Sequence, residues 1–238
     1  MEEARLVATD VVLGSGNRLF LDQVSVSVPA GQMLAVTGPS GSGKTSLLSV
    51  LGGLLVPASG TVSYDGGPVG GRDGAPRRGT AIILQTYGLV PTLTAEENVA
   101  IALRARSVGG ADATARALMA LHRVGIGELA DRLVDELSGG QLQRVAVARG
   151  LVVEPDVLLA DEPTSELDEV NRDHVVAELR IEAERGALVV VATHDPDLAD
   201  ACDLVVKLDE GRVQMAEQTV TIQQGHEHDL FKPPSGSP

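Results

Sequence analysis

The 238-residue sequence predicts an α/β fold: a parallel-sheet core with an antiparallel β-lobe at the N-terminus and an inserted α-helical subdomain. Two observations support this prediction. Short apolar runs typical of buried strands alternate with helical segments, and a glycine-rich loop joins one of these runs to a helix. The length fits one large domain with an insertion, since domains commonly hold ~100–200 residues. We expect one domain over residues 1–224, followed by a disordered tail over 225–238 that is rich in Gly, Pro and polar residues.

The first part of the chain predicts the β-lobe and the start of the core. Residues 6–8 are apolar, residues 24–28 alternate apolar and polar side chains, and glycines and a Pro-Ala-Gly turn interrupt this strand pattern. Residues 33–37 are almost entirely apolar, as in a strand covered on both faces. A buried helix is expected over 46–55, ending near Pro57.

The middle of the chain predicts the helical insertion. Residues 65–79 contain six glycines and two prolines, so they are expected to form a loop. Residues 81–84 follow as another buried strand. Helical periodicity then runs over 94–137, interrupted at Gly109-Gly110, and we expect an inserted helical subdomain over 86–137.

Strands and helices alternate again in the last third. Helices are expected at about 139–153 and 170–185, and buried strands at 157–160 and 188–192. This alternation is typical of a parallel core sheet.

Composition restricts the partners. Nineteen basic and 33 acidic residues give a net charge of −14, and the chain has two Phe, two Tyr and no Trp. Nucleic-acid affinity depends on Lys and Arg at phosphates, and single-strand binding depends on aromatic stacking. We therefore expect no nucleic-acid partner.

The sequence also predicts a cytoplasmic location. The N-terminus lacks a basic region followed by a long apolar stretch, and no run reaches the ~18–20 apolar residues that cross a bilayer. The single Cys202 forms no internal disulfide, which fits a reducing compartment. A membrane role would therefore require a partner.

Residues 38–45 read Gly-Pro-Ser-Gly-Ser-Gly-Lys-Thr between a predicted strand and a predicted helix, the pattern and context of a phosphate-binding P-loop. Glycines let the backbone approach phosphate oxygens, Lys44 reaches the β- and γ-phosphates, and Thr45 offers a hydroxyl to Mg²⁺. The motif predicts a P-loop NTPase with a RecA-like core, using ATP and Mg²⁺; a plain glycine turn is the alternative. The expected phosphate-binding residues are Gly38, Pro39, Ser40, Gly41, Ser42, Gly43, Lys44, Thr45 and Ser46.

Two carboxylates follow the apolar run 157–160. Asp161 and Glu162 would lie at the carboxyl edge of the sheet, where α/β proteins bind ligands. We expect Asp161 to hold the metal through water and Glu162 to orient the water that attacks the γ-phosphorus. Ordinary surface charge is the alternative interpretation.

Residues 137–144 read Leu-Ser-Gly-Gly-Gln-Leu-Gln-Arg, a glycine-containing helix start that favours an anion. This string resembles the signature motif of ATP-binding cassette (ABC) ATPases, in which the loop of one subunit contacts the γ-phosphate held by the other. Gln85 resembles the family's Q-loop glutamine, residues 165–168 its D-loop, and residues 193–195 the segment of its switch histidine. The resemblance covers about residues 6–213.

The resemblance implies roles for individual residues. Glu162 would be the catalytic base, His194 would contact the γ-phosphate, and Gln85 would join Thr45 and Asp161 at Mg²⁺. A hydrogen-bonded structural role is the alternative for His194. A partner copy's nucleotide would meet the signature loop and D-loop, at Ser138, Gly139, Gly140, Gln141 and Asp168.

Two residues depart from the family pattern. Leu13 stands where family members carry an aromatic residue against the adenine, so we expect weak base stacking and competition by GTP within about tenfold; packing inside the β-lobe is the alternative for Leu13. Glu166 stands where the D-loop has a small residue, and its carboxylate would slow the closure of a dimer by charge repulsion.

The resemblance implies the ATP-hydrolysing subunit of an ABC transporter, forming a homodimer on ATP binding. It would drive a separate integral-membrane permease through the helical lobe, at the inner face of the cell membrane. Residues 85–94 resemble those of lipoprotein-releasing and macrolide-efflux cassettes, which favours export or release. The alternatives are a soluble ABC ATPase of DNA repair, chromosome maintenance or translation, and a slow nucleotide-dependent switch. The missing coiled-coil insertion, the single cassette and the acidic charge disfavour the soluble ATPase.

Overall fold

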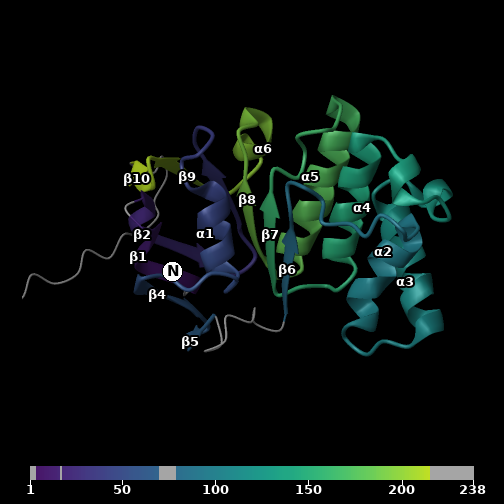
Figure 1. The fold of residues 1–238 in the computed structure, drawn as a ribbon, viewed down its shortest axis with the longest axis horizontal. Helices are drawn as coiled ribbons and strands as arrows, with labels where there is room; N and C mark the ends of the chain where they lie inside the picture. The colour runs from purple at the N-terminus through teal and green to yellow at the C-terminus, as the bar shows by residue number, and fades with distance from the viewer. Residues whose placement is uncertain (1–3, 17, 70–78, 215–238) are drawn as a thin grey trace, which may run out of the picture.

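A six-stranded sheet forms the centre of the computed structural model, which describes residues 4–16, 18–69 and 79–214 (Figure 1). The strand order is β10-β9-β3-β8-β7-β6, and all neighbours are parallel except the hairpin of β9 and β10. The strands are β3 (Met33–Thr37), β6 (Thr80–Ile83), β7 (Val157–Asp161), β8 (Leu188–Ala192), β9 (Leu204–Asp209) and β10 (Arg212–Gln214). The predicted parallel core is therefore confirmed.

A second, antiparallel sheet forms the N-terminal β-lobe. Its order is β2-β1-β4-β5, with β1 at Ala4–Ser15, β2 at Arg18–Pro29, β4 at Ser59–Tyr64 and β5 at Gly67–Pro68. Helix α1 (Lys44–Leu51) packs against strands of both sheets and buries four apolar side chains in the core that they share. This packing holds the first turn of α1 at the carboxyl end of β3.

Helices α2 to α5 lie on the other side of the central sheet from α1 (Figure 1). Helices α4 (Gly139–Leu151) and α5 (Glu169–Glu184) pack on it, and α2 (Ala95–Arg104) and α3 (Gly110–Arg123) pack on α4. The central sheet separates two apolar cores, and β7 contributes to both. Leu158 and Ala160 pack into the core beneath α4 and α5, whereas Val157 and Leu159 pack into the core around α1. The period-2 alternation of a strand thus buries both of its faces.

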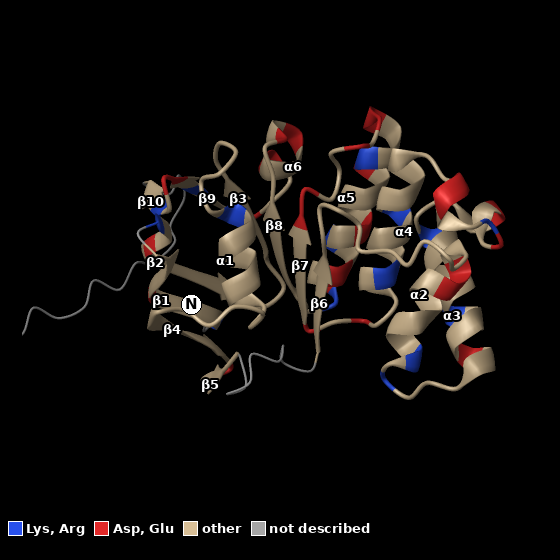
Figure 2. Cartoon of the chain, viewed as in Figure 1, with Lys and Arg blue, Asp and Glu red and all other residues tan. Residues whose placement is uncertain are grey.

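Capping residues set the helix starts. Thr94 and Glu97 form a reciprocal capping box at α2, and Gly109 precedes α3, so the Gly109-Gly110 interruption separates two helices as expected. Short 3₁₀ turns at Gly127–Leu129 and Val134–Glu136 lead to α4. Acidic and basic residues are interspersed over this helical part of the chain (Figure 2).

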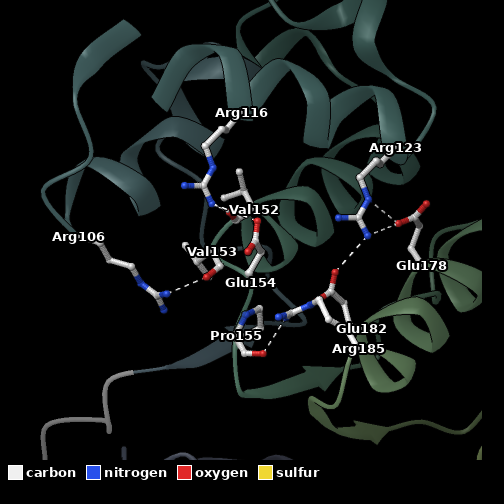
Figure 3. A network of polar contacts seen from close by, with 10 residues as sticks. All are labelled: Arg106, Arg116, Arg123, Val152, Val153, Glu154, Pro155, Glu178, Glu182 and Arg185. Atoms are coloured by element: carbon white, nitrogen blue, oxygen red, sulfur yellow. Dashed lines mark hydrogen bonds and ion pairs between the residues drawn. The ribbon is translucent and has the colours of Figure 1, made fainter. Parts of the chain in front are cut away.

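Arginines tie the helical lobe to the core (Figure 3). Arg123 of α3 pairs with Glu178 at 2.6 Å and with Glu182 at 3.1 Å, both on α5. Arg106 donates a hydrogen bond to the Val153 carbonyl and Arg116 donates one to the Val152 carbonyl, at the end of α4. The lobe is therefore held by polar contacts as well as by apolar packing.

Some elements differ from the sequence predictions. Strands β4, β9 and β10 and the short helix α6 (Pro196–Asp200) were not predicted, and the expected loop 65–79 contributes the two-residue strand β5. Helix α1 ends before Gly52-Gly53 rather than at residue 55, since glycine at the end of a helix favours termination. The expected tail over 225–238 lies outside the described residues. No helix within the described ranges is long and apolar enough to span a bilayer.

Candidate nucleotide-binding site

The loop between β3 and α1 wraps into a cradle whose geometry requires glycine. Gly38 and Gly43 have φ values of 141° and 107°, in the left-handed region that side chains disfavour. A Cβ at Gly43 would lie 2.5 Å from the Phe20 carbonyl oxygen, and one at Gly38 would overlap the Leu208 carbonyl. The backbone of the loop is thus pressed against β2 and β9 on one side and is left open on the other.

The polar groups of the cradle fit a bound phosphate. The Lys44 ammonium donates hydrogen bonds to the carbonyls of Gly38 at 2.8 Å and Pro39 at 3.2 Å, at the open side of the loop. The Ser42 hydroxyl is buried and has no hydrogen-bond partner within the described residues. A buried hydroxyl beside an ammonium group and a helix N-terminus favours an anionic ligand.

A hydroxyl and a carboxylate meet beside this cradle. The Thr45 hydroxyl donates a hydrogen bond to Asp161 at 2.6 Å, and Asp161 is 5% exposed at the end of β7. Burial raises the pKa of Asp161, as does the Glu162 charge to a smaller extent, while the Thr45 hydrogen bond and Lys44 act in the opposite direction. A divalent cation would favour the charged form of this carboxyl.

The oxygen atoms of Thr45, Asp161 and Gln85 are the hard ligands that Mg²⁺ prefers. Gln85 is exposed and lines the same cavity. In the part of the chain that the structure describes, no three His, Cys, Asp or Glu residues cluster as a metal site. A Mg²⁺ ion would therefore take further ligands from water and from phosphate, as it commonly does.

Glu162 and His194 form a pair at the opening of the cavity. The His194 Nδ1 atom lies 2.9 Å from the Glu162 carboxylate, whose side chain is 9% exposed, while the His194 side chain is 71% exposed. Glu162 has a left-handed φ of 50°, which is strained for this residue type. Its backbone is fixed from two sides, because its N–H donates to the Ala192 carbonyl and its carbonyl accepts from the Gln143 amide.

One cavity of about 520 Å³ contains residues from four separate motifs. Its lining includes the P-loop, the Q-loop glutamine, the carboxylates after β7 and the switch histidine, with two residues that sequence reasoning missed. These lining residues are Arg18, Phe20, Gly38, Pro39, Ser40, Gly41, Gly43, Lys44, Thr45, Ser46, Gln85, Asp161, Glu162 and His194. A neighbouring cavity of about 290 Å³ shares Glu162 and His194 and extends to the D-loop.

Leu13 does not line the cavity, which differs from the expectation that it stands at the base position. It pairs with Leu21 across the β-lobe and packs against the apolar core around α1. Its apolar side chain is better accommodated there than at a polar opening. Phe20 and Arg18, on the neighbouring strand, line the cavity instead.

The signature and D-loop residues do not line the cavity of their own chain. Ser138 is exposed and caps α4, and its N–H donates a hydrogen bond to the Gln141 side chain at 2.9 Å. Gly139 and Gly140 form the first turn of α4. Asp168 caps α5, and hydrogen bonds from Asn171 lower the pKa of its carboxyl group. Ser138 and Asp168 are exposed, whereas Gly139 and Gly140 are half-buried.

Glu166 lies close to Gly139 and Gly140. A Cβ at Gly139 would be 3.1 Å from the Glu166 carboxylate, and one at Gly140 would be 2.8 Å from the Glu166 carbonyl. Tyr87, which follows the Q-loop, has a pKa raised mainly by burial and also by the Glu166 charge. Glu166 therefore lies against the start of α4, and its charge also acts on Tyr87.

Comparison with known proteins gives consistent matches. A family model described as "ABC transporter" matches residues 21–165. An uncharacterized ABC transporter ATP-binding protein of Mycobacterium bovis is 40% identical over 207 residues, which are 85% of this chain and 63% of that protein. The chain therefore spans less than two thirds of the length of that relative.

A shorter relative and a solved structure match over more of their length. The lipoprotein-releasing system ATP-binding protein LolD of Bordetella pertussis is 43% identical over 201 residues, covering 82% of this chain and 87% of that protein. A dimeric, post-hydrolysis structure of the ATP-binding cassette MJ0796 bound to ADP and Pi superposes with a TM-score of 0.83 at 31% identity, covering 90% of this chain and 98% of that one.

Proposed function

Because the chain belongs to the ABC transporter ATP-binding family, we propose that it binds ATP with Mg²⁺ and hydrolyses ATP to drive a separate integral-membrane permease. The observation that carries this proposal is the single cavity in which the P-loop, Asp161, Glu162 and His194 converge. These residues lie far apart in the sequence, between positions 38 and 194, and their convergence supports a site with phosphate-binding and hydrolytic side chains.

The cradle residues bind and orient the substrate. The loop amides, the Ser42 hydroxyl and Lys44 would hold the phosphates, while Thr45, Asp161 and Gln85 would hold Mg²⁺. When bound, Mg²⁺ would neutralise charge on the phosphate oxygens. Lys44 leaves its hydrogen bonds to the loop carbonyls when phosphate oxygens replace them as acceptors.

Glu162 acts on the attacking water. Its carboxylate orients this water and accepts a proton as the water oxygen bonds to the γ-phosphorus; the bond from phosphorus to the ADP oxygen breaks, yielding ADP and phosphate. His194 positions the carboxylate through its Nδ1 atom at 2.9 Å, and its exposed ring is accessible to a bound γ-phosphate. The strained backbone of Glu162 fixes this direction.

We expect two copies of the chain to complete each site. Ser138 is exposed, and Gly139, Gly140 and Gln141 are partly exposed, at a helix N-terminus outside their own cavity, where they are available to the phosphate held by a second copy. The dimeric structure described for MJ0796 with ADP and Pi supports this arrangement. The similarity to LolD supports release or export as the transport direction and a position at the inner face of the membrane.

The hydrolytic role is tested with Glu162→Gln and the matched control Glu184→Gln, which changes an exposed carboxylate on α5. Glu162→Gln should retain ATP binding and lower the rate of hydrolysis at least about 100-fold, since a positioned base contributes that much. Glu184→Gln should hydrolyse ATP like the wild type in the presence of Mg²⁺. Wild-type turnover in Glu162→Gln would contradict the assignment of the base.

The transport role is tested by affinity purification of the full chain from detergent-solubilised membranes of its own cells. A multi-span membrane protein should copurify in a fixed ratio and stimulate hydrolysis. Quantitative recovery of the chain in the soluble fraction, with no membrane protein bound, would contradict this part of the proposal.

A further inference from the structure

Phe20 lies at the cavity of the P-loop. The structure describes three aromatic residues, Phe20, Tyr64 and Tyr87, and among them only Phe20 lines the cavity of the P-loop. Arg18 lines the same wall, and its guanidinium carbon lies 5.4 Å from the centroid of the Phe20 ring. Arg18 and Phe20 are two positions apart on β2 and therefore share one face of that strand.

The backbone fixes this wall relative to the phosphate cradle. The Phe20 carbonyl packs against Gly43, the last residue of the loop, so closely that a Cβ there would be 2.5 Å away. Two residues further along β2, the Asp22 N–H donates to the Gly211 carbonyl at 2.8 Å, and the Asp22 carboxylate pairs with Arg212 at 2.6 Å. The start of β2 is thus held by both the P-loop and the β9–β10 hairpin.

We infer that Arg18 and Phe20 form the wall on which the purine base of the nucleotide stacks, at β2 rather than at the β1 position of Leu13. An aromatic ring and a guanidinium group both offer flat, polarizable faces to a base. The adjacent cradle holds the phosphates, so the wall lies on the side of the cavity left for the rest of the nucleotide. This inference rests on the proposed ATP-binding function.

Stacking makes a definite prediction about specificity. Every base has a π-face, so stacking on Phe20 tolerates guanine as well as adenine, and ATP and GTP should bind within about tenfold of each other. Inorganic tripolyphosphate, which has no base, should bind more weakly than either and should be insensitive to the wall.

The test is calorimetric titration of the full chain with ATP and with tripolyphosphate, both in the presence of Mg²⁺. Phe20→Leu keeps an apolar side chain but removes the ring, so it should weaken ATP at least about fivefold and leave tripolyphosphate within about twofold. Phe20→Trp should keep the affinity for ATP. Arg18→Met should also weaken ATP selectively, since the apolar side chain lacks the planar cation.

Leu19→Ala is the matched control, because Leu19 is 57% exposed and points to the opposite face of β2. It should change neither affinity. Retained tripolyphosphate binding shows that a variant is folded. An unchanged ATP affinity in Phe20→Leu, or an equal loss for ATP and tripolyphosphate, would overturn the base wall.

Lys44→Ala separates this inference from the proposed function. It should weaken both ligands, since it removes charge from the phosphate cradle. If Lys44→Ala weakens both and Phe20→Leu weakens neither, ATP binding at the P-loop stands and the base wall is wrong. If the wild type binds neither ligand, the proposed function and the base wall both fail.

Discussion

Burial of the Asp161 carboxyl group lowers the stability of the nucleotide-free protein. Its carboxyl group is buried and has a raised pKa, so in the nucleotide-free folded chain its ionisation is less favourable than in the unfolded chain. Above the pKa of about 3.9 for an unfolded Asp, this difference lowers the free energy of unfolding; at lower pH, both states are protonated and the difference disappears. This loss of stability is the expected cost of the metal-binding role that we propose for Asp161.

Asp161→Asn should therefore stabilise the nucleotide-free protein at pH 7, with a rise in Tm of about 2–4 °C for each kcal/mol. The gain should shrink as the pH falls toward 4. MgATP should raise the Tm of the wild type more than that of Asp161→Asn, since the amide is a poorer Mg²⁺ ligand. Thermal unfolding measures both effects, and Asp131→Asn, at an exposed residue, is the control. A lower Tm for nucleotide-free Asp161→Asn would contradict the stated cost of burial.

In the proposed dimer, the start of α4 in one chain meets the phosphate that the other chain holds. Glu166 places a negative charge at this position. Its carboxylate lies beside Gly139 at the N-terminus of α4, whose dipole favours an anion by about 0.3–1 kcal/mol. Glu166→Ala should raise the ATPase rate at limiting protein concentration about two- to fivefold. Glu166→Gln should have a similar effect, and salt should reduce the difference from wild type. A lower rate in both variants would instead make Glu166 a positive contributor to turnover.

At the level of elements, Arg123 forms the ion pairs that join α3 to α5. Arg123 faces two carboxylates whose side chains are 10% and 2% exposed, those of Glu178 and Glu182, and Arg185 also pairs with Glu182 (Figure 3). Loss of Arg123 leaves Glu178 buried without its cation, which is costly. Ion pairs at the C-terminal end of α3 thus help to hold the helical lobe against α5.

Arg123→Met should lower the free energy of unfolding by about 2 kcal/mol, less than for a fully buried pair because Arg123 is partly exposed. Arg116→Met is the matched control: its partner Glu154 is 63% exposed at 3.4 Å, so the loss should be about 1 kcal/mol or less. Urea unfolding with equal m-values measures both. Equal losses of unfolding free energy in the two variants would show that burial of Glu178 and Glu182 does not determine how strongly the ion pairs of Arg123 stabilise the protein.

The sequence predicted those elements that carry their own pattern. The apolar runs 33–37 and 188–192 match β3 and β8 residue for residue, because strands buried on both faces need continuous apolar side chains. Strand β4, with the sequence Ser-Gly-Thr-Val-Ser-Tyr, has little apolar character and forms because it pairs with β1. Helix α6, at five residues, is too short for periodicity to show.

The residues of the candidate site also differ in whether the sequence alone predicts them. The P-loop, Asp161, Glu162 and His194 are found in recognisable local strings, so the sequence alone places them in one site. Arg18 and Phe20 have no such string. Their position beside Gly43 depends on the pairing of β2 with β1 and on the β9–β10 hairpin, which are contacts between distant parts of the chain.

At the scale of the whole molecule, charge opposes self-association. Each chain carries a net charge of −14, and acidic residues gather in the segment that connects α3 to α4 (Figure 2). Two such chains repel each other, most strongly at low ionic strength. A dimer therefore needs a specific bridging interaction, and we propose that a nucleotide held by the P-loop of one chain and the Ser138 loop of the other provides it.

The molar mass of Glu162→Gln in saturating MgATP, measured by light scattering during size-exclusion chromatography, tests this claim most directly. Hydrolysis is blocked in this variant, so the mass should rise from 24.7 kDa to about twice that value. Adding Ser138→Arg in the same chain should keep ATP bound and return the mass to 24.7 kDa, since Ser138 serves only the partner's site. A monomer mass for Glu162→Gln in saturating MgATP, or a dimer that Ser138→Arg leaves intact, would contradict the shared site.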